Sequence, residues 1–218
     1  MSENRWISDL HWRREGQQTR SERTQTRLID AAEALILEKG TEATSIADIA
    51  ARAGSSVGTV YHHFKDKKAL FLALFARMTE RYKALNAAGA DPARWQGATI
   101  RDLMRGYLEL TMAAYRENAA AKAAVSVVMA DFPELARHYA EIQAETRKAL
   151  YALMHERRAE VGHPDPDAAL AFTIDTLAAL MRARMDPAQR AASLQDLSDE
   201  DFVAQVLSLA ATYLRLKP

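Results

Sequence analysis

The chain has 218 residues, no cysteine, and 29 Lys+Arg against 29 Asp+Glu, so its formal net charge is zero. A chain of this length buries a full core without covalent cross-links. The missing thiols exclude disulfides, thiolate metal sites and thiol redox sensing. A hydrophobic fraction of 49% with 27% charged residues is typical of a globular protein. Zero net charge argues against a protein that coats nucleic acid indiscriminately, because such proteins are strongly basic.

Nothing in the sequence predicts a membrane segment or a secretion signal. The longest uncharged apolar stretch, Phe202 to Leu214, is shorter than the ~20 residues that a membrane-spanning helix needs. Charged residues such as Arg5, Asp9 and Arg13 interrupt any apolar core near the N-terminus. We therefore expect a cytoplasmic protein with no membrane partner.

Sparse glycine and proline, alanine-rich segments and apolar residues at helical spacing predict an all-α protein. The first strong helix is expected at 22–39, with Gly40 as its stop signal. Ser45 and Asp48 have the spacing of a capping box, in which each side chain bonds the other residue's backbone amide. They predict a second helix that ends at Gly54.

A third short helix is expected directly after a tight Gly-Ser turn, which makes the segment a helix-turn-helix candidate. On a helical wheel its apolar residues face one way and its small or hydrogen-bonding residues face the other. The expected buried set is Val57, Val60 and Phe64, and the expected exposed set is Gly58, Thr59 and His62. A glycine on an exposed helix face suits a backbone that must approach a partner closely.

Further helices are expected along the rest of the chain. One runs from Asp66 to about Leu85, and a loop at 87–98 forms the best internal boundary. The others are placed at about 99–116, 120–131, 134–161, 167–185 and 199–216. A loop at 186–198 separates the last two helices.

Three motifs stand in order near the N-terminus: TSIADIA at 44–50, AGSSVGTVYHHF at 53–64 and KKAL at 67–70. With their surroundings, 27–74, they resemble the DNA-binding domain of TetR-family transcriptional regulators. The resemblance covers about a quarter of the chain. It departs from the family at Ser55, where an aliphatic residue is usual, and at Lys68, where an acidic one is frequent.

The resemblance implies which residues contact DNA. Ser45, at a helix N-terminus, and Lys67 would contact phosphates, and Tyr61 and His62 would reach the DNA backbone. The residues that would face or approach base edges are Ser55, Ser56, Val57, Gly58 and Thr59. The locally basic segments 11–28 and 52–68 hold nine Lys+Arg against three acidic residues, and from them we add Arg23 and Arg27. Alternatively, Tyr61 lies at the edge of the core and the arginines form an ordinary solvated face.

Dimerisation is expected because a single recognition helix reads only a few base pairs. The last two helices are apolar on more than one face, as helices buried on all sides are, and in the family such terminal helices form the dimer interface. The expected interface residues are Leu170, Ile174, Leu177, Met181, Phe202, Val206, Leu209 and Tyr213. The alternative is that these residues are the core of a monomer.

Aromatic, methionine and hydroxyl side chains in 99–161 have the character of an apolar ligand pocket. The candidate lining residues are Met104, Tyr107, Thr111, Tyr115, Met129, Phe132 and Tyr139. Plain core is the alternative for each. The resemblance implies a small apolar or amphipathic effector, and no cofactor is expected. No metal site is expected either, because the adjacent His62 and His63 point about 100° apart on a helix and cannot chelate one ion together.

The sequence therefore predicts a homodimeric repressor of palindromic double-stranded operator DNA that a small molecule releases. The expected domains are an N-terminal arm (1–20), which is an extra helix, disordered or a minor-groove arm, a helix-turn-helix domain (21–68) and an effector and dimerisation domain (69–218). Alternatives are a TetR-like activator, a regulator that answers to a protein, and a helical bundle that does not bind DNA. An enzyme is disfavoured because no catalytic constellation or phosphate loop is present.

Overall fold

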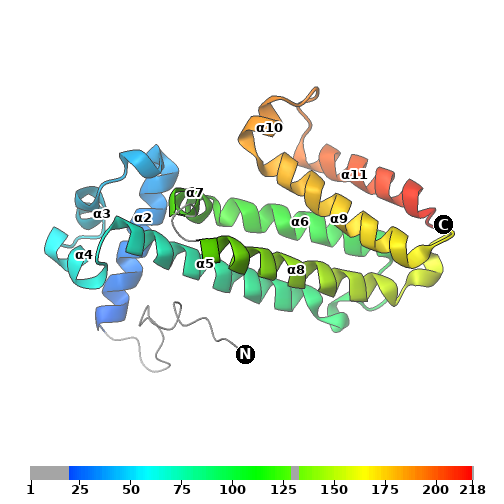
Figure 1. Cartoon of the computed structure of the whole chain (residues 1–218), viewed down its shortest axis with the longest axis horizontal. Coiled ribbons are helices and arrows are strands. Elements are labelled where there is room, and N and C mark those ends of the chain that lie inside the picture. The colour runs from blue at the N-terminus through cyan, green and yellow to red at the C-terminus, as the bar shows by residue number, and fades with distance from the viewer. Residues whose placement is uncertain (1–19, 129–132, 218) are drawn as a thin grey trace. The chain divides into compact units, whose positions relative to one another are not determined.

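The computed structural model describes residues 20–128 and 133–217, with 125–128 by their backbone alone, and these residues form an all-α protein (Figure 1). The longer helices are α2 (Arg20–Ala43), α5 (Lys67–Ala90), α6 (Ile100–Glu117), α7 (Ala119–Val128), α8 (Pro133–His155), α9 (Pro166–Met185) and α11 (Asp199–Leu214). No β-strand occurs in the described part of the chain, and an isolated antiparallel bridge joins Val161 to Leu216. The predicted fold class is confirmed.

The chain divides into two compact units. Of the described residues, the first unit contains 20–81, 118–128 and 133–138, and the second contains 82–117 and 139–217. This division differs from the expected boundary at residue 68, because α7 belongs to the first unit and α5 contributes residues to both.

In the first unit, α2 packs against α3 and α7. The apolar residues of α2 that are buried recur at helical spacing: Leu28, Ala31, Ala32, Leu35 and Ile36. Gly40 has a φ of 82° and leaves the helical conformation, so the regular part of α2 ends where the glycine predicts. The chain resumes a helical conformation after this kink, so α2 extends to Ala43.

Two short helices follow, each opened by a serine cap. At α3 (Ile46–Arg52) the Ser45 hydroxyl accepts the Asp48 amide at 3.1 Å, and the Asp48 carboxylate accepts the Ser45 amide at 3.0 Å. At α4 (Val57–His63) the Ser56 hydroxyl accepts the Thr59 amide at 3.0 Å. The predicted capping box and helix-turn-helix are therefore present, because caps depend on residues three apart in sequence.

The helix α5 continues to Ala90, past its expected end near Leu85, so the predicted loop at 87–98 is wrong in its first part. Alanines favour the helix here. The Gly89 carbonyl lies in the last turn, where helical amides no longer reach it, and it accepts the Trp95 indole N–H at 2.8 Å. A short 3₁₀ helix, η1 (Pro92–Trp95), brings Trp95 to that position.

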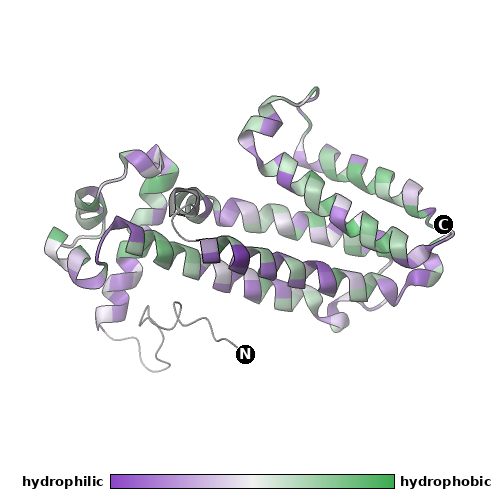
Figure 2. Ribbon diagram, in the orientation of Figure 1, coloured by the Kyte–Doolittle hydropathy of each residue, from purple (hydrophilic) through white to green (hydrophobic). Residues whose placement is uncertain are grey.

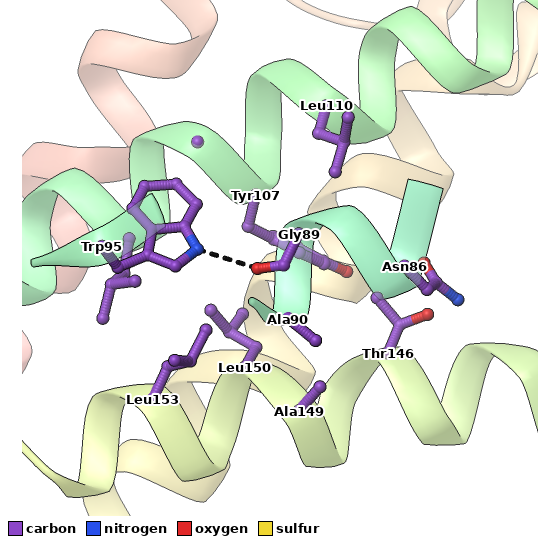
Figure 3. Close-up of a pocket in the computed structure, with 12 residues that line it drawn as sticks. Asn86, Gly89, Ala90, Trp95, Tyr107, Leu110, Thr146, Ala149, Leu150 and Leu153 are labelled. Atoms are coloured by element: carbon purple, nitrogen blue, oxygen red, sulfur yellow. Dashed lines mark hydrogen bonds between the residues drawn. The ribbon is translucent and has the colours of Figure 1, made fainter. Parts of the chain in front are cut away.

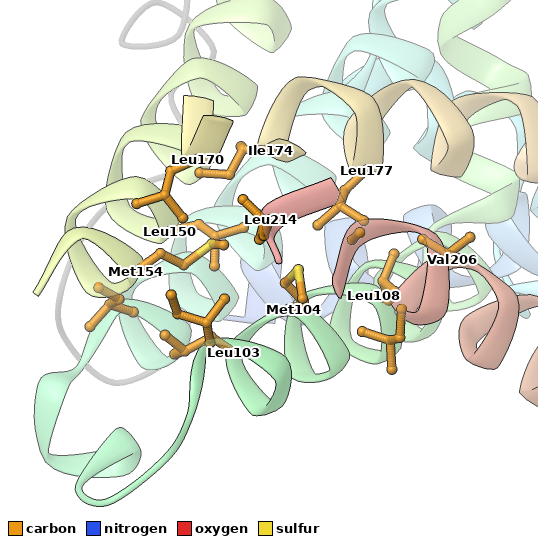
Figure 4. Close-up of a cluster of buried hydrophobic side chains, with 14 of the residues drawn as sticks. Leu103, Met104, Leu108, Leu150, Met154, Leu170, Ile174, Leu177, Val206 and Leu214 are labelled. Atoms are coloured by element: carbon orange, nitrogen blue, oxygen red, sulfur yellow. The ribbon is translucent and has the colours of Figure 1, made fainter. Parts of the chain in front are cut away.

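The second unit is built around a core shared by α6, α8, α9 and α11 (Figure 4). Each helix supplies aliphatic or methionine side chains that are at most a few per cent exposed, such as Leu103, Met154, Leu170 and Leu214. Figure 2 shows that α9 and α11 carry apolar residues along most of their length. These two helices carry more apolar side chains than the core buries, so some of them, such as Phe172 and Leu209, remain exposed.

The corner between α9 and α11 is held by Arg184, whose side chain is 6% exposed. Its guanidinium donates to the Leu197 carbonyl at 2.6 Å and to the Asp199 carboxylate at 2.8 Å. Arg116 of α6 donates to the same carboxylate at 2.8 Å. The hydrogen bond from Arg184 holds the pKa of Asp199 below its usual range. A short helix, α10 (Pro187–Ala191), forms inside the loop expected at 186–198.

Candidate functional site

The outward face of α4 is the candidate DNA-reading surface. Val60 and Phe64 are buried, whereas Val57 is 42% exposed and Tyr61 is 54% exposed. The expectation that Val57 belongs to the buried face is therefore wrong, and so is the alternative that Tyr61 lies at the edge of the core. Val57 is the first residue of α4, and the inner side of this two-turn helix is occupied by Val60 and Phe64.

Gly58 and His62 are exposed beside Val57 and Tyr61, so the four residues form one outward face. Thr59 is half-buried, and its hydroxyl lies 2.9 Å from the Ser56 hydroxyl. Ser55 is half-buried in the turn. Thr59 therefore supports the N-terminal cap of α4 and is less available to a base edge than the sequence suggested.

The donors of Ser45 are both engaged within the capping box. Its amide and its hydroxyl donate to Asp48 Oδ2 at 3.0 and 2.6 Å. Lys39 Nζ lies 2.7 Å from the same carboxylate oxygen. The hydrogen bonds from Lys39 and then from Ser45 hold the pKa of Asp48 well below its usual range. An incoming phosphate at α3 would meet first-turn amides rather than a free Ser45 hydroxyl.

Lys67 opens α5, and its ammonium donates to the Thr41 carbonyl at 2.7 Å. The ammonium also lies 5.4 Å from the centre of the Phe71 ring. These contacts give the cation a structural reason to stand at a helix N-terminus, where the helix dipole disfavours it. An ammonium has three donors, so the bond to Thr41 leaves the others for a phosphate.

Two of the predicted arginines lie on α2. Arg23 and Arg27 are exposed and one turn apart, so they share a face with Arg20. The Arg27 guanidinium donates to the Thr24 hydroxyl at 3.4 Å. Elsewhere in this unit a basic side chain is already paired, since Arg52 lies 2.6 Å from Glu38. The local positive charge that the sequence suggested is therefore partly neutralised.

Of the expected effector-pocket residues that the structure describes, Tyr107, Tyr115 and Tyr139 lie close enough for their charges to interact, but only Tyr107 lines the pocket described below. Met104 is fully buried in the core of the second unit, and Tyr115 donates to the Met185 carbonyl at 2.6 Å. Thr111 donates to the Tyr107 carbonyl at 2.7 Å, and Tyr139 packs edge-on against Tyr82 with ring centres 6.0 Å apart. Burial raises the pKa of Tyr139. Met129 and Phe132 lie outside the described residues.

Tyr107 alone of the described candidates lines a pocket between α5, α6, α8 and η1 (Figure 3). Burial raises the pKa of its hydroxyl. Sequence reasoning missed the other lining residues, among them Asn86, Trp95, Gly106 and Thr146. A glycine inside the amphipathic helix α6 was the available signal, because an interior glycine marks a close approach by another group.

The expected dimer residues divide into inward and outward ones. Five of them are at most 5% exposed within this single chain, so they belong to its own core: Leu170, Ile174, Leu177, Met181 and Val206. Phe202 is half-buried against the same core. Leu209 and Tyr213 remain outward, at 58% and 38% exposure. The sequence pattern shows apolar stripes but not which stripe the chain's own helices cover.

An apolar groove runs over the outward sides of α9 and α11. Phe172, which is 59% exposed and was not expected at the interface, lies with its ring centre 5.3 Å from that of Tyr213. Leu180 and Leu209 continue the lining, and the buried Leu177 and Val206 reach its floor. A contiguous exposed apolar surface of this kind marks an interaction site.

Two negative findings apply to the described part of the chain. No group of three or more His, Cys, Asp or Glu side chains stands close enough together to hold a metal ion. No helix there has the length and apolar character needed to cross a membrane.

The helix-turn-helix segment matches a known protein family. Residues 28–74 match the model of bacterial regulatory proteins of the tetR family. The HTH-type transcriptional repressor KstR2 of Rhodococcus jostii (strain RHA1) is 34% identical over 70 residues, which cover 30% of this chain and 34% of that protein. The chain therefore matches only about a third of that relative's length.

Longer matches extend into the second unit. The HTH-type transcriptional repressor Rv1474c of Mycobacterium tuberculosis is 28% identical over 178 residues, covering 78% of this chain and 88% of that protein. A TetR-family regulator from Mesorhizobium loti MAFF303099 has a TM-score of 0.61 at 22% identity, covering 90% of this chain and 98% of that one. At this identity the structural likeness shows the fold alone.

Proposed function

We propose that this chain is a regulator of the TetR family, whose model matches its residues 28–74, and that it represses transcription by binding a palindromic operator as a homodimer. A small apolar or amphipathic effector releases it. Residues 21–68 serve as the DNA-binding domain and 69–218 as the effector and dimerisation domain, and the protein acts in the cytoplasm, where its DNA lies.

The observation that carries DNA binding is the outward face of α4. A valine, a glycine, a tyrosine and a histidine are exposed on one side of a capped helix. Isolated exposed apolar residues are ordinary, but here Val57 stands beside a helical glycine that lets the backbone come close to a partner. Val57 would touch a thymine methyl, while the polar ends of Tyr61 and His62 reach phosphates or sugars.

The groove on α9 and α11 supports the homodimer. Its exposed apolar side chains, Phe172, Leu209 and Tyr213, and the half-buried Leu180 come from two helices of one chain. A second copy presents the same surface, so a two-fold axis through the groove matches apolar residues with apolar residues. Two recognition helices then address two half-sites, which a palindromic operator provides.

Repression is preferred over activation because KstR2 and Rv1474c are both named repressors. An activator, or a regulator that answers to a protein, has the same helix-turn-helix and differs in operator position or in its effector. Mapping the bound site relative to the promoter, followed by a screen for release by small molecules, separates these functions.

The proposal is tested by selecting bound DNA from a random pool with the full chain. The expected product is a two-fold symmetric site with half-sites about one helical turn apart. Val57→Ala should change the preferred bases, and the matched control Leu37→Ala should not, because Leu37 is exposed on α2 outside the proposed reading face. A pool that yields no enriched sequence, together with no salt-dependent binding to DNA, refutes DNA recognition.

A further inference from the structure

We propose that the pocket walled by Trp95 binds an uncharged, apolar molecule of about one ring that carries a hydroxyl or N–H group, and that this molecule enters by displacing the Trp95 indole. The inference rests on the proposed function in one respect, which is that the ligand is the effector. All the residues that line the pocket belong to the second unit.

The lining of the pocket selects against charge. Its twelve residues, drawn in Figure 3, include no acidic or basic side chain. Its polar side chains are Asn86, Tyr107 and Thr146, and the Thr146 hydroxyl already donates to the Ile142 carbonyl at 3.0 Å. An ionised ligand group among these residues would lose water without touching a charged lining side chain, which disfavours binding. Arg147 and Arg182 lie outside the lining, where their positive charges act on the Tyr107 hydroxyl.

The indole of Trp95 is closely packed against the backbone of α6 and hydrogen-bonded. A Cβ placed on Gly106 would lie 2.3 Å from its Cη2 atom, so the ring rests directly on the backbone of α6. The indole N–H donates to the Gly89 carbonyl at 2.8 Å (Figure 3). The site therefore already accommodates the edge of one aromatic ring and one N–H donor, both from the Trp95 indole.

The space left beside the indole is too small for a ligand. The pocket has about 50 Å³ of free volume, whereas a cavity that binds benzene measures about 150 Å³. A ring-sized molecule fits only if the indole leaves. The Gly89 carbonyl then loses its donor, and a ligand hydroxyl or N–H restores the hydrogen bond that would otherwise be missing.

The surrounding contacts allow the side chain to move while its backbone stays. Arg157, in the turn that follows α8, donates to the Trp95 carbonyl and to the Ala98 carbonyl, both at 2.7 Å. It also donates to the Leu153 carbonyl at 2.7 Å. The residues before Trp95, from Asp91 to Arg94, are exposed, so solvent is open to a displaced indole. Rotation about the side-chain bonds of Trp95 is therefore the proposed gate.

The experiment uses Trp95 as its own reporter. The full chain has three tryptophans, and Trp6→Phe with Trp12→Phe leaves Trp95 as the only one. Titration with cyclohexylmethanol should give a saturable red shift of the emission, because the indole moves from an apolar wall into water. Cyclohexanecarboxylate at pH 7 has the same ring and an ionised group, and it should bind about tenfold or more weakly. An equal response to both compounds, or no saturable response, overturns the inference.

Calorimetry on two further variants separates a displaced gate from a fixed wall. Trp95→Ala opens the pocket permanently and should bind cyclohexylmethanol about tenfold or more tightly, because the open state no longer has to be populated first. Weaker binding would mean that the indole is a ligand contact and would overturn the gate. Ala149→Phe should abolish binding by filling the pocket, while the control Ala152→Phe, on the exposed side of α8, should bind normally.

The outcomes also separate this inference from the proposed function. A protein that binds its selected DNA but ignores both cyclohexyl compounds retains the regulator role and refutes the pocket. A protein that binds cyclohexylmethanol with the expected shift but selects no DNA retains the pocket and refutes the regulator role.

Discussion

Asp48 is a residue whose environment is set by Ser45, its partner in the capping box, and by Lys39, which lies nine residues before it in the sequence. Its carboxylate accepts the amide and hydroxyl of Ser45 and lies 2.7 Å from the Lys39 ammonium. The hydrogen bond from Lys39 is the largest cause of its lowered pKa, followed by those from Ser45. In the unfolded chain the carboxyl has its ordinary pKa, 3.8, so it binds a proton there at a higher pH than in the folded chain.

This difference predicts a pH dependence of folding with a definite sign. The stabilisation by Asp48 is present above the unfolded pKa and is lost as the pH falls toward the lower, folded pKa. In Asp48→Asn this part of the dependence should disappear, so the variant's urea midpoint should fall less between about pH 5 and about pH 2.5 than that of the wild type. Glu42→Gln, at an exposed position nearby, is the control. Parallel curves for the wild type and Asp48→Asn would contradict the expectation.

Lys67 has a role inside the fold in addition to the proposed contact with DNA. In Lys67→Met the aliphatic stem remains and the bond to the Thr41 carbonyl is lost, which should lower the free energy of unfolding by about 1 kcal/mol. If the ammonium also meets a phosphate, the slope of log affinity against log salt should flatten by about one unit. Urea unfolding and salt-dependent DNA binding measure the two effects.

Lys148→Met, at an exposed position on α8, is the control for both measurements on Lys67. A loss of stability in Lys67→Met with an unchanged salt slope would remove Lys67 from the proposed DNA-binding residues. It would leave Lys67 as a structural link between the end of α2 and the start of α5.

At the scale of elements, ion pairs join α2 to α5 within the first unit. Arg77 of α5 pairs with Asp30 and Glu33 of α2, and Arg81 lies 3.1 Å from Glu33. The side chains of Arg77 and Glu33 are only 21% and 15% exposed. Pairs this far from solvent are screened less than surface pairs, and breaking one leaves a partly buried charge without its main partner.

Arg77→Met should therefore destabilise the protein by about 1–3 kcal/mol in urea unfolding. The matched control is Arg105→Met on α6, where Arg105 and Glu109 are well exposed and 4.0 Å apart. An exposed pair of this kind contributes about 0.5 kcal/mol or less. Equal losses of unfolding free energy in the two variants would mean that burial does not increase the contribution of the α2–α5 ion pairs to stability.

The helices themselves were largely predictable, but their ends and faces were not. Gly40 and Gly54 both have a positive φ at the positions where the sequence placed helix ends. The end of α5 was misplaced because Trp95, which bonds the Gly89 carbonyl, reaches it from outside the helix. The buried face of α4 was misplaced at Val57 because a short helix has too few residues for its periodicity to exclude one member.

At the scale of the whole molecule, the groove on α9 and α11 predicts the oligomeric state. Leu209→Glu places a charge on an exposed apolar surface and should convert the proposed dimer into a monomer, as measured by light scattering, with little change in unfolding. Leu194→Glu is the control, because Leu194 is fully exposed and does not line the groove. A Leu209→Glu protein that remains dimeric would place the interface elsewhere.

The sequence by itself determined the all-α class, the serine caps, the glycine ends and the helix-turn-helix. These features follow from interactions between residues three or four apart, whose partners are visible in the sequence. Only the tertiary structure decided that Leu177 faces inward while Leu209 faces outward, that Lys67 bonds Thr41, and that Trp95 rests on Gly106. Burial depends on which distant segment covers a surface, and an apolar period reveals the stripe but not the segment that covers it.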